Sequence, residues 1–433
     1  MMFTVIVSLL VVVAFLTLGV PLPFCFGGGL MVMSIMGGAT MKGMLLWGLG
    51  QISNSVLLCV PLFIFAGTLM SESGIAKYLL DFVNVFVGRM RGGLGVVASV
   101  SCAIIGAISG SGFTGVAATG PILIPRMEQE GYPRGYATAL VTDSSILGLL
   151  IPPSVVMIVY GWVTETSILA CFLATVGPGL LITFLFALIN IIWSRKFDLK
   201  LEPKLPPKEK WNEIKRRTRL ALPALMMPFI ILGGIYGGIM TPTEAAAVAV
   251  IYSIPVGFFI YKGLTLKNFY EIAWNSATSV GAILIMILFC LMLSQTYVML
   301  RVPQALVQVI FDITQNKVIL LVMINILLFF VGMIVNDITG VILIAPLLLP
   351  LVQAIGIHPI QFAAIMGVNL AMGGVTPPYA SILYLGMRIG KVEFMEIVKP
   401  AMVLLLLGYV PVVFLTSFWP DLSLFLPKLL GFL

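Results

Sequence analysis

The chain has 433 residues, of which 60% are hydrophobic and only 9% are charged, and its net charge is +7. A soluble protein of this length needs far more surface charge, whereas a lipid-facing surface needs none. The excess positive charge lies in residues 195–219, which hold ten Lys or Arg and four Asp or Glu, so nucleic-acid binding is not predicted. Five scattered cysteines, one histidine and no GxxxxGK[ST] phosphate loop argue against a zinc site, a bis-histidine haem and an ATPase.

Long uncharged apolar runs predict membrane-spanning helices. No charged residue occurs from Met1 to Met41 or from Ser276 to Leu300, and each run exceeds the roughly 20 residues that cross a bilayer. We expect an all-α polytopic membrane protein, and we expect its first span to be a retained helix because no basic residue precedes it. The expected spans are 4–20, 24–41, 46–70, 94–108, 113–130, 135–160, 167–193, 221–240, 244–261, 270–300, 318–335, 340–356, 360–387 and 398–418.

The chain contains an internal repeat. Shifting the sequence by 225 residues aligns 114–161 with 339–386 without a gap, and twelve of the 48 positions are identical, several of them Gly or Pro. Such residues define the backbone, so the match predicts two related structural units. The predicted organisation is a first repeat (1–193), a basic linker (194–220), a second repeat (221–420) and a C-terminal tail (421–433).

Charges at the ends of the spans give the repeats a direction. A basic loop between apolar spans is typical of the cytoplasmic face. With 195–219 on that side, 135–160 runs outward and 360–387 runs inward, so the two repeats are inverted, as in many secondary transporters. Arginines flank both ends of 92–130, which predicts a re-entrant hairpin with its tip at 109–112. The counterpart is a hairpin at 318–356, with its tip at Asn336 and Asp337.

Two helices, 135–160 and 360–387, are broken by a Gly-to-Pro-Pro segment. Irregular backbone inside a membrane must be buried in protein or line a watery cavity, so the two tips and two breaks should converge. Freed carbonyls and hydroxyls suit a hard cation such as sodium, and restarting helices present N–H groups that suit a carboxylate. The predicted sodium-binding residues are Ser109, Gly110, Ser111, Thr114, Gly148, Pro152, Asn336, Asp337, Thr339, Gly373, Thr376 and Pro377. The predicted substrate-binding residues are Ser111, Gly112, Ser144, Ser145, Pro153, Asp337 and Pro378.

Three acidic residues lie within apolar spans. A carboxylate at such a position is costly, so Asp337 is the sharpest candidate, to balance a bound cation or take a proton. Asp143 is read equally as a site or a packing residue, since Val368 occupies its repeat position. Glu244 fits a capping box that begins at Thr241, and we interpret it as structural.

Five segments resemble the large membrane subunit of tripartite ATP-independent periplasmic (TRAP) transporters, and the resemblance covers essentially the whole chain. They are SGSGFTGVAATGPILIPRM (109–127), LGLLIPPS (147–154), LPALMMPFIILGGIYGGIMTPTEAAAVAV (222–250), NDITGVILIAPLLLP (336–350) and GGVTPPYASILYLG (373–386). The resemblance implies an elevator-type fold in a bacterial inner membrane and sodium as the coupling ion, with no organic cofactor. It also implies two partners: a separate, small four-helix membrane subunit and a soluble periplasmic protein that delivers substrate.

The expected function is therefore sodium-coupled uptake of a small organic anion, such as a C4-dicarboxylate, a sugar acid or a keto acid, and no enzymatic activity. Two alternatives stay open. A self-sufficient sodium–dicarboxylate or citrate symporter of the same architecture would need no binding protein. A non-transporting structural membrane subunit belongs to a different class, and the buried Asp337 and the broken helices argue against it.

Overall fold

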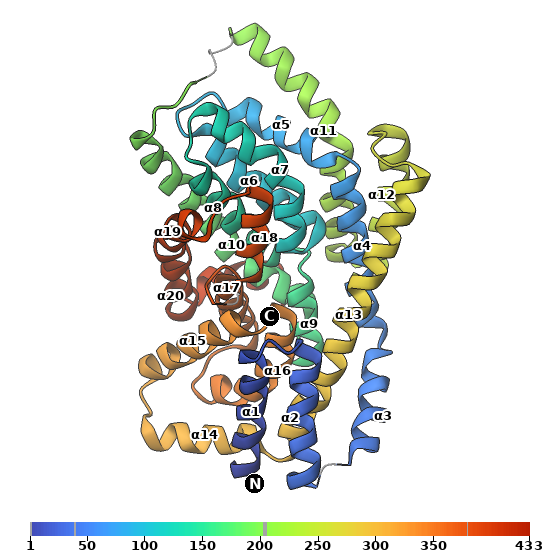
Figure 1. Cartoon of the computed structure of the whole chain (residues 1–433), viewed down its shortest axis with the longest axis vertical. Helices are drawn as coiled ribbons and strands as arrows, with labels where there is room; N and C mark the ends of the chain where they lie inside the picture. Colours follow the sequence, from blue (N-terminus) through green and yellow to red (C-terminus); the bar gives the residue numbers. More distant parts are fainter. Residues whose placement is uncertain (1, 39, 202–205, 379) are drawn as a thin grey trace.

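A computed structural model describes residues 2–38, 40–201, 206–378 and 380–433 (Figure 1). Within these ranges all regular secondary structure is helical. Eight of the described helices are long and apolar enough to cross a membrane. The all-α polytopic prediction is thereby confirmed.

The helices of the first half and the linker were predicted in outline. Their bounds are α1 Met2–Thr17, α2 Leu22–Gly37, α3 Met41–Ile52, η1 Ser55–Leu58, α4 Cys59–Glu72, α5 Ile75–Val87, α6 Gly93–Ser109, α7 Gly112–Glu130, α8 Arg134–Ser145, η2 Ile146–Leu149, α9 Val155–Val163, α10 Ile168–Trp193 and η3 Ser194–Lys196.

The second half continues with elements of similar kinds. Their bounds are α11 Pro207–Tyr236, α12 Pro242–Pro255, η4 Val256–Ile260, α13 Leu266–Met299, α14 Val302–Ile313, α15 Lys317–Ile334, α16 Asp337–Ala354, α17 Pro359–Gly374, α18 Ser381–Gly390, α19 Phe394–Leu404, η5 Leu405–Tyr409, α20 Val410–Phe418 and α21 Asp421–Leu429.

Some predicted boundaries were wrong. The expected span 46–70 is two helices, α3 and α4, because the chain breaks at Ser53 and Asn54, where the Asn54 side chain caps the following turn. Residue 221 is not a helix start, since α11 begins in the linker at Pro207. Residues 421–429 of the predicted tail form α21, which packs on α10.

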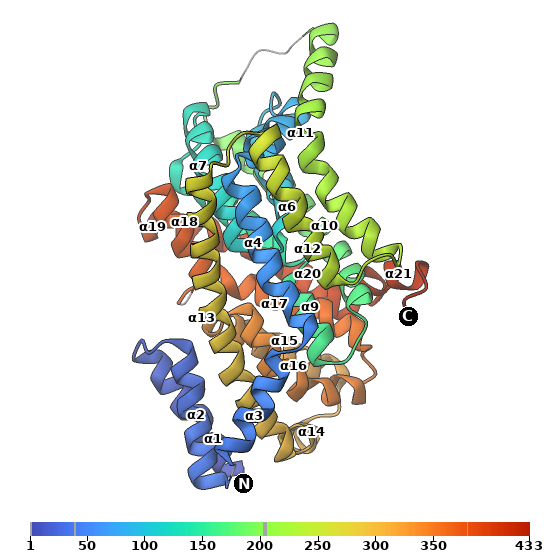
Figure 2. The same ribbon diagram turned by 90° about the vertical axis from the view of Figure 1, so that its right-hand side faces the viewer.

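One group of helices surrounds the long helix α13. Figures 1 and 2 show α4, α12 and α13 running roughly along the long axis on one side of the molecule. The helix α13 packs against α2, α3, α4 and α16, while α11 packs against α5 and α12. This group carries large apolar side chains exposed on its surface, such as Phe229, Phe259 and Trp274, as expected for contact with lipid.

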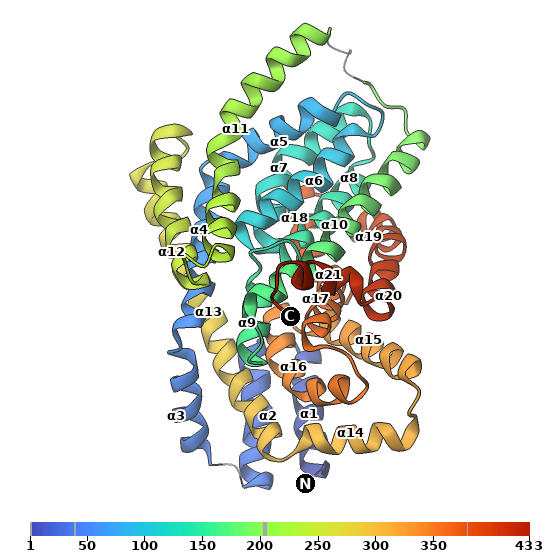
Figure 3. The same cartoon turned by 180° about the vertical axis from the view of Figure 1, so that it is seen from behind.

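The remaining helices form two bundles, and each bundle includes one helix from the other half of the chain (Figure 3). The helix α18 of the second half packs on α7 and α8, whereas α9 of the first half packs on α16 and α17. One hydrogen bond joins α18 to α8, and another joins α9 to α17. Arg134 Nε donates to the Gly390 carbonyl (2.6 Å), and the Tyr160 hydroxyl donates to the Pro359 carbonyl (2.7 Å).

The capping box predicted around Glu244 is present at the start of α12. The Glu244 amide donates to the Thr241 hydroxyl (3.2 Å), and the Glu244 carboxylate accepts the Thr241 amide (2.8 Å). These bonds satisfy orphan donors of the first helical turn. The structural interpretation of Glu244 is thereby confirmed.

His358 makes the start of α17 sensitive to pH. Its Nδ1 accepts the Ile360 amide (3.2 Å), and partial burial, followed by the charge of Lys428, lowers the pKa of His358 below its usual range. As the pH falls, the histidine of the unfolded chain is therefore protonated before that of the folded chain. This contribution to stability is complete above about pH 6.5 and is lost as the pH falls from that value to the lowered pKa of the folded state.

We expect His358→Asn, which keeps an acceptor at the cap, to reduce this dependence in thermal unfolding at a series of pH values. We expect His358→Ala to lose about 0.5–1 kcal/mol of stability at neutral pH, because the cap is removed. Identical pH profiles for the wild type and His358→Asn would contradict this explanation.

Candidate functional site

The first hairpin turns between α6 and α7 at Gly110 and Ser111, which we call the first tip. Gly110 has φ +62°, a left-handed conformation that glycine adopts without strain. Ser111 is extended and precedes α7 without a side-chain cap, so the first amides of α7 lack a side-chain partner at this position. The Ser109 hydroxyl donates to the Ser111 carbonyl (3.3 Å) across the turn.

The first tip lies against the first break, which comprises residues 150–154 between η2 and α9. A methyl group added to Gly110 would lie 2.8 Å from the Pro153 carbonyl oxygen. One turn before the tip, a methyl group added to Gly106 would lie 2.3 Å from the Cα of Gly148. Backbone therefore packs directly on backbone here, and this explains the glycine at position 148.

The second hairpin turns between α15 and α16 at Val335 and Asn336, the second tip. Asn336 caps α16, because its side chain accepts the Ile338 amide (3.1 Å). Asp337 follows as the first residue of α16 and accepts the same amide (3.0 Å). A carboxylate in the first turn of a helix is favoured by the helix dipole, so α16 helps to stabilise the Asp337 charge.

The second break joins α17 to α18, and its residue Tyr379 lies outside the described residues. The Thr376 hydroxyl donates to the Met372 carbonyl (2.7 Å), and the Thr376 amide donates to the Gly373 carbonyl (3.0 Å). The Gly373 carbonyl, four residues before Pro377, is therefore not left without a donor. The Thr376 hydroxyl uses its proton in this hydrogen bond, so the lone pairs of its oxygen remain available to a cation.

Both halves contribute to one small cavity beside Asp337. Its volume is about 10 Å³, close to the 10–15 Å³ or so that one water needs, so it suits a single ion and excludes an organic acid in this conformation. The residues that line it are Phe113, Leu149, Gly332, Val335, Asn336, Asp337, Leu370, Gly374, Ser381 and Ile382. The second tip, the start of α7, the end of η2 and the two helix ends that flank the second break therefore line one cavity.

Only Asn336 and Asp337 among the predicted residues line this cavity. Ser144 and Ser145 are fully buried on α8, where Ser144 bonds with Ser99 (3.2 Å) and Ser145 donates to the Thr142 carbonyl (2.7 Å). The remaining predicted residues do not line the cavity. They are Ser109, Gly110, Ser111, Gly112, Thr114, Gly148, Pro152, Pro153, Thr339, Gly373, Thr376, Pro377 and Pro378.

Gly332 is a site residue that the alignment of the two internal repeats did not reveal. A methyl group added to Gly373 would lie 2.3 Å from the Gly332 carbonyl carbon, just as Gly106 meets Gly148 in the first half. Gly332 lies 226 residues after Gly106, whereas Gly373 lies 225 after Gly148. A gap-free shift of 225 therefore pairs Gly106 with Val331 and overlooks the match.

A buried polar pair accompanies each of these glycine contacts. The Ser99 and Ser144 hydroxyls lie 3.2 Å apart, and Asn369 Nδ2 donates to Asn325 Oδ1 (2.8 Å). The spacing is the same in both halves. On the hairpin helices, Ser99 precedes Gly106 and Asn325 precedes Gly332 by seven residues. On the broken helices, Ser144 precedes Gly148 and Asn369 precedes Gly373 by four. Each hairpin thus meets its broken helix through a close glycine contact and a buried polar pair.

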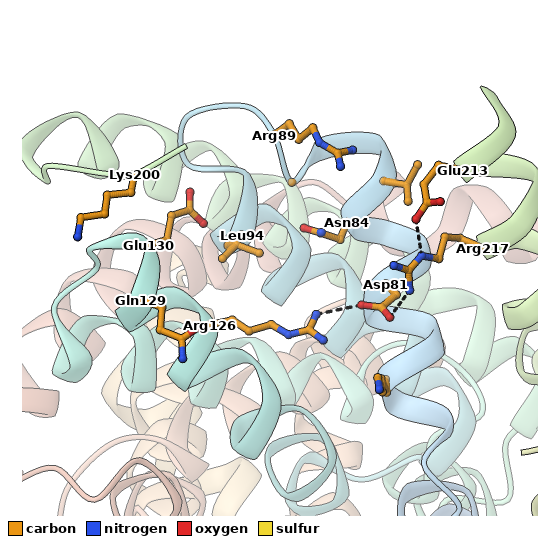
Figure 4. Close-up of a pocket in the computed structure, with 13 residues that line it drawn as sticks. Asp81, Asn84, Arg89, Leu94, Arg126, Gln129, Glu130, Lys200, Glu213 and Arg217 are labelled. Carbon is orange, nitrogen blue, oxygen red and sulfur yellow. Dashed lines mark hydrogen bonds and ion pairs between the residues drawn. The ribbon is translucent and has the colours of Figure 1, made fainter. Parts of the chain in front are cut away.

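A larger polar cavity of about 710 Å³ lies at the end of the molecule near the linker (Figure 4). It lies between α5, α7 and α11. Asp81 of α5 accepts from Arg126 of the first hairpin (3.0 Å) and also from Arg217 of α11, which in turn bonds Glu213 (2.8 Å). One carboxylate thus holds together three elements that are distant in sequence.

We expect Asp81→Ala to lower thermal stability by about 1–3 kcal/mol, because Arg126 and Arg217 lose the carboxylate between them. Their side chains are 34% and 29% exposed, so solvent limits the loss. The matched control is Asp421→Ala, which breaks an exposed pair with Lys428 (3.4 Å) and should change stability by less than about 0.5 kcal/mol. Equal unfolding temperatures for both variants would contradict this role of Asp81.

Paired hairpins and broken helices around a small cavity that contains a carboxylate are the architecture of a membrane transporter. The sequence matches the family described as "Tripartite ATP-independent periplasmic transporter, DctM component" over residues 7–422. The chain therefore belongs to the DctM family, the large permease component of TRAP transporters, and is a multi-pass protein of the bacterial inner membrane.

Two relatives illustrate the family. The chain is 34% identical over 375 residues to the C4-dicarboxylate TRAP transporter large permease protein DctM of Pseudomonas aeruginosa, covering 87% of each chain. It is also 34% identical over 383 residues to the ectoine/5-hydroxyectoine TRAP transporter large permease protein UehC of Ruegeria pomeroyi, covering 88% of each. Equal identity to proteins named for different substrates means that overall similarity does not select a substrate.

The fold is also similar to a solved transporter. The Alcanivorax borkumensis YdaH transporter superposes with a TM-score of 0.55 at 15% identity, covering 87% of this chain and 90% of the other. At this identity the likeness concerns the fold alone. It agrees with the expectation of a transporter architecture.

Proposed function

We propose that this protein drives sodium-coupled uptake of a small carboxylate-bearing solute by an elevator mechanism. Substrate would be delivered by a soluble periplasmic binding protein, and a small four-helix membrane subunit would complete the transporter. The description of the family as tripartite supports this pair of partners. The observation that carries the proposal is the ion-sized cavity in which Asn336 and Asp337 of the second half meet Phe113 and Leu149 of the first half.

The chemistry of the site supports sodium as the coupling ion. A carboxylate, an amide oxygen and hydroxyl or carbonyl oxygens are ligands that hard cations prefer. Asn336 and Asp337 supply the first two at the cavity, and the Thr339 hydroxyl, which donates to the Asn336 carbonyl (3.0 Å), keeps acceptor capacity nearby. Asp337 also supplies the negative charge that a bound cation balances.

A carboxylate is the shared feature of the candidate substrates. C4-dicarboxylates and ectoine, named in the two relatives above, both carry one. The start of α7 at Ser111 offers amides without a side-chain cap, which suit a carboxylate. Dicarboxylates, sugar acids, keto acids and ectoine therefore form the panel to be tested.

Transport in proteoliposomes tests the proposal. The chain would be reconstituted with its small subunit, and uptake of each labelled solute measured with and without an inward sodium gradient and the binding protein. We expect uptake only when both are present. Uptake without the binding protein would favour a self-sufficient symporter, and uptake that ignores the sodium gradient would overturn sodium coupling.

A further inference from the structure

Asp143 lies in α8, five residues before Gly148, and the transport site described above does not use it. Its side chain is fully buried, and neither carboxylate oxygen has a hydrogen-bond partner within the described residues. An isolated ionised carboxylate in such surroundings is strongly disfavoured, because nothing replaces the hydration that the charge loses on burial. A neutral carboxyl group avoids most of this penalty.

The hydroxyl groups beside Asp143 on α8 make other hydrogen bonds. Thr142 donates to the carbonyl one turn earlier (2.7 Å), and Ser145 donates to the Thr142 carbonyl (2.7 Å). Ser144 bonds with Ser99 of α6 (3.2 Å). A sodium ion needs several oxygen ligands at once, whereas a proton needs only one carboxylate oxygen. The arrangement therefore favours a proton over a metal ion.

The helix opposite Asp143 contains a π-helical turn. In η5 the Val410 amide donates to the Leu405 carbonyl five residues earlier, and Tyr409 at the end of this turn is fully buried. The Tyr409 hydroxyl donates to the backbone carbonyl of Asp143 (2.9 Å). Such wide turns are rare within helices and are frequent at functional sites.

The titratable groups facing Asp143 are Tyr409 of η5 and Cys102 of α6, whose thiol bonds to the Val141 carbonyl (3.7 Å). On the helices packed against α8, Arg388 of α18 and Lys399 of α19 are exposed, whereas Arg134 pairs with Glu128 and the Glu396 backbone meets Gly135 near the other end of α8. Roughly two helical turns, about 12 Å, separate that end from Asp143. No described ion pair includes Asp143, so no neighbouring cation compensates its charge.

We propose that Asp143 is a proton-binding site, separate from the cavity at Asp337 and able to exchange its proton when the packing of Tyr409 against α8 loosens. One proton from bulk water adds to one carboxylate oxygen, forms an O–H bond and neutralises the side chain. Because α8 continues into the first break, the protonation state of Asp143 is linked to the position of the broken helix. The proposal does not depend on sodium coupling or on any substrate.

Infrared spectroscopy of the purified protein in lipid nanodiscs, titrated with pH, tests the proposal without a transport assay. We expect a carboxylic-acid C=O band at neutral pH that disappears at alkaline pH, is absent from Asp143→Asn and is unchanged in Asp421→Asn, the exposed control. Tyr409→Phe should keep the band and shift the midpoint of its titration.

Two results would overturn the proposal. A spectrum that is unaffected by Asp143→Asn would mean that Asp143 is not protonated. A band that belongs to Asp143 but persists at every pH at which the protein stays folded would mean a permanently neutral packing residue. If Asp143→Asn does not fold, Asp143→Glu replaces it, and an unshifted band in that variant also overturns the proposal.

Discussion

Replacing Asp337 with asparagine should weaken the apparent sodium affinity of uptake by about 10- to 100-fold. Asparagine keeps the size and the acceptor oxygen at the start of α16 but removes the negative charge. The loss of one charge-assisted interaction is about 1.5–3 kcal/mol, and each 1.4 kcal/mol corresponds to a factor of ten in affinity. The measurement is the sodium dependence of initial uptake rates in proteoliposomes.

The control for this experiment is Asp312→Asn, which removes an exposed carboxylate from α14 outside the cavity. Its sodium dependence should match that of the wild type. If Asp337→Asn retained wild-type sodium affinity, Asp337 would be a helix-capping residue only, and the cation site would have to be sought elsewhere. An unfolding temperature close to that of the wild type would exclude a general loss of structure.

Replacing Gly373 with alanine should lower the free energy of unfolding by about 1–3 kcal/mol or more. The new methyl group would lie 2.3 Å from the Gly332 carbonyl carbon and 2.5 Å from its Cα. These are backbone atoms, so α15 and α17 must separate, and overpacking of this kind is strongly destabilising. Since both helices border the cavity at Asp337, uptake should fall as well.

Gly233→Ala provides the matched control, because it makes the same chemical change inside a helix. Gly233 lies in α11, and a methyl group added there meets no atom within 4 Å. Alanine is the better helix former by about 0.5–1 kcal/mol, so Gly233→Ala should be neutral or stabilising. A similar unfolding temperature for both variants would show that the close contact between α15 and α17 is unimportant.

The sequence predicted most of the helices and the places where two of them break, because apolar runs and Gly-to-Pro-Pro segments are local signals. Three shorter helices, α5, α14 and α21, were missed. The first two are amphipathic, and α5 buries Ile75, Leu79 and Leu80 on one face while Lys77 lies on another. A search for uninterrupted apolar runs does not detect this pattern.

The candidate site was predicted in part. Asn336 and Asp337 stand out as polar residues in an apolar span, and both line the cavity. Phe113, Leu149 and Gly332 carry no such signal, because only the packing of α7, η2 and α15 brings them to Asp337. The repeat register is also locally shifted by one residue at Gly332, so a gap-free comparison does not pair it with its counterpart.

The exchange of α9 and α18 between the two bundles has a consequence for biosynthesis. The surface that α7 and α8 present to α18 stays uncovered until Ser381 and the following residues are made, some 236 residues after α8 ends at Ser145. At about 5–20 residues per second this corresponds to roughly 10–50 s. During that interval the nascent chain displays the small, polar face of α8 to lipid or to the insertion machinery. Premature termination before α18 should therefore yield a first half that is removed by membrane proteases rather than an independently stable domain.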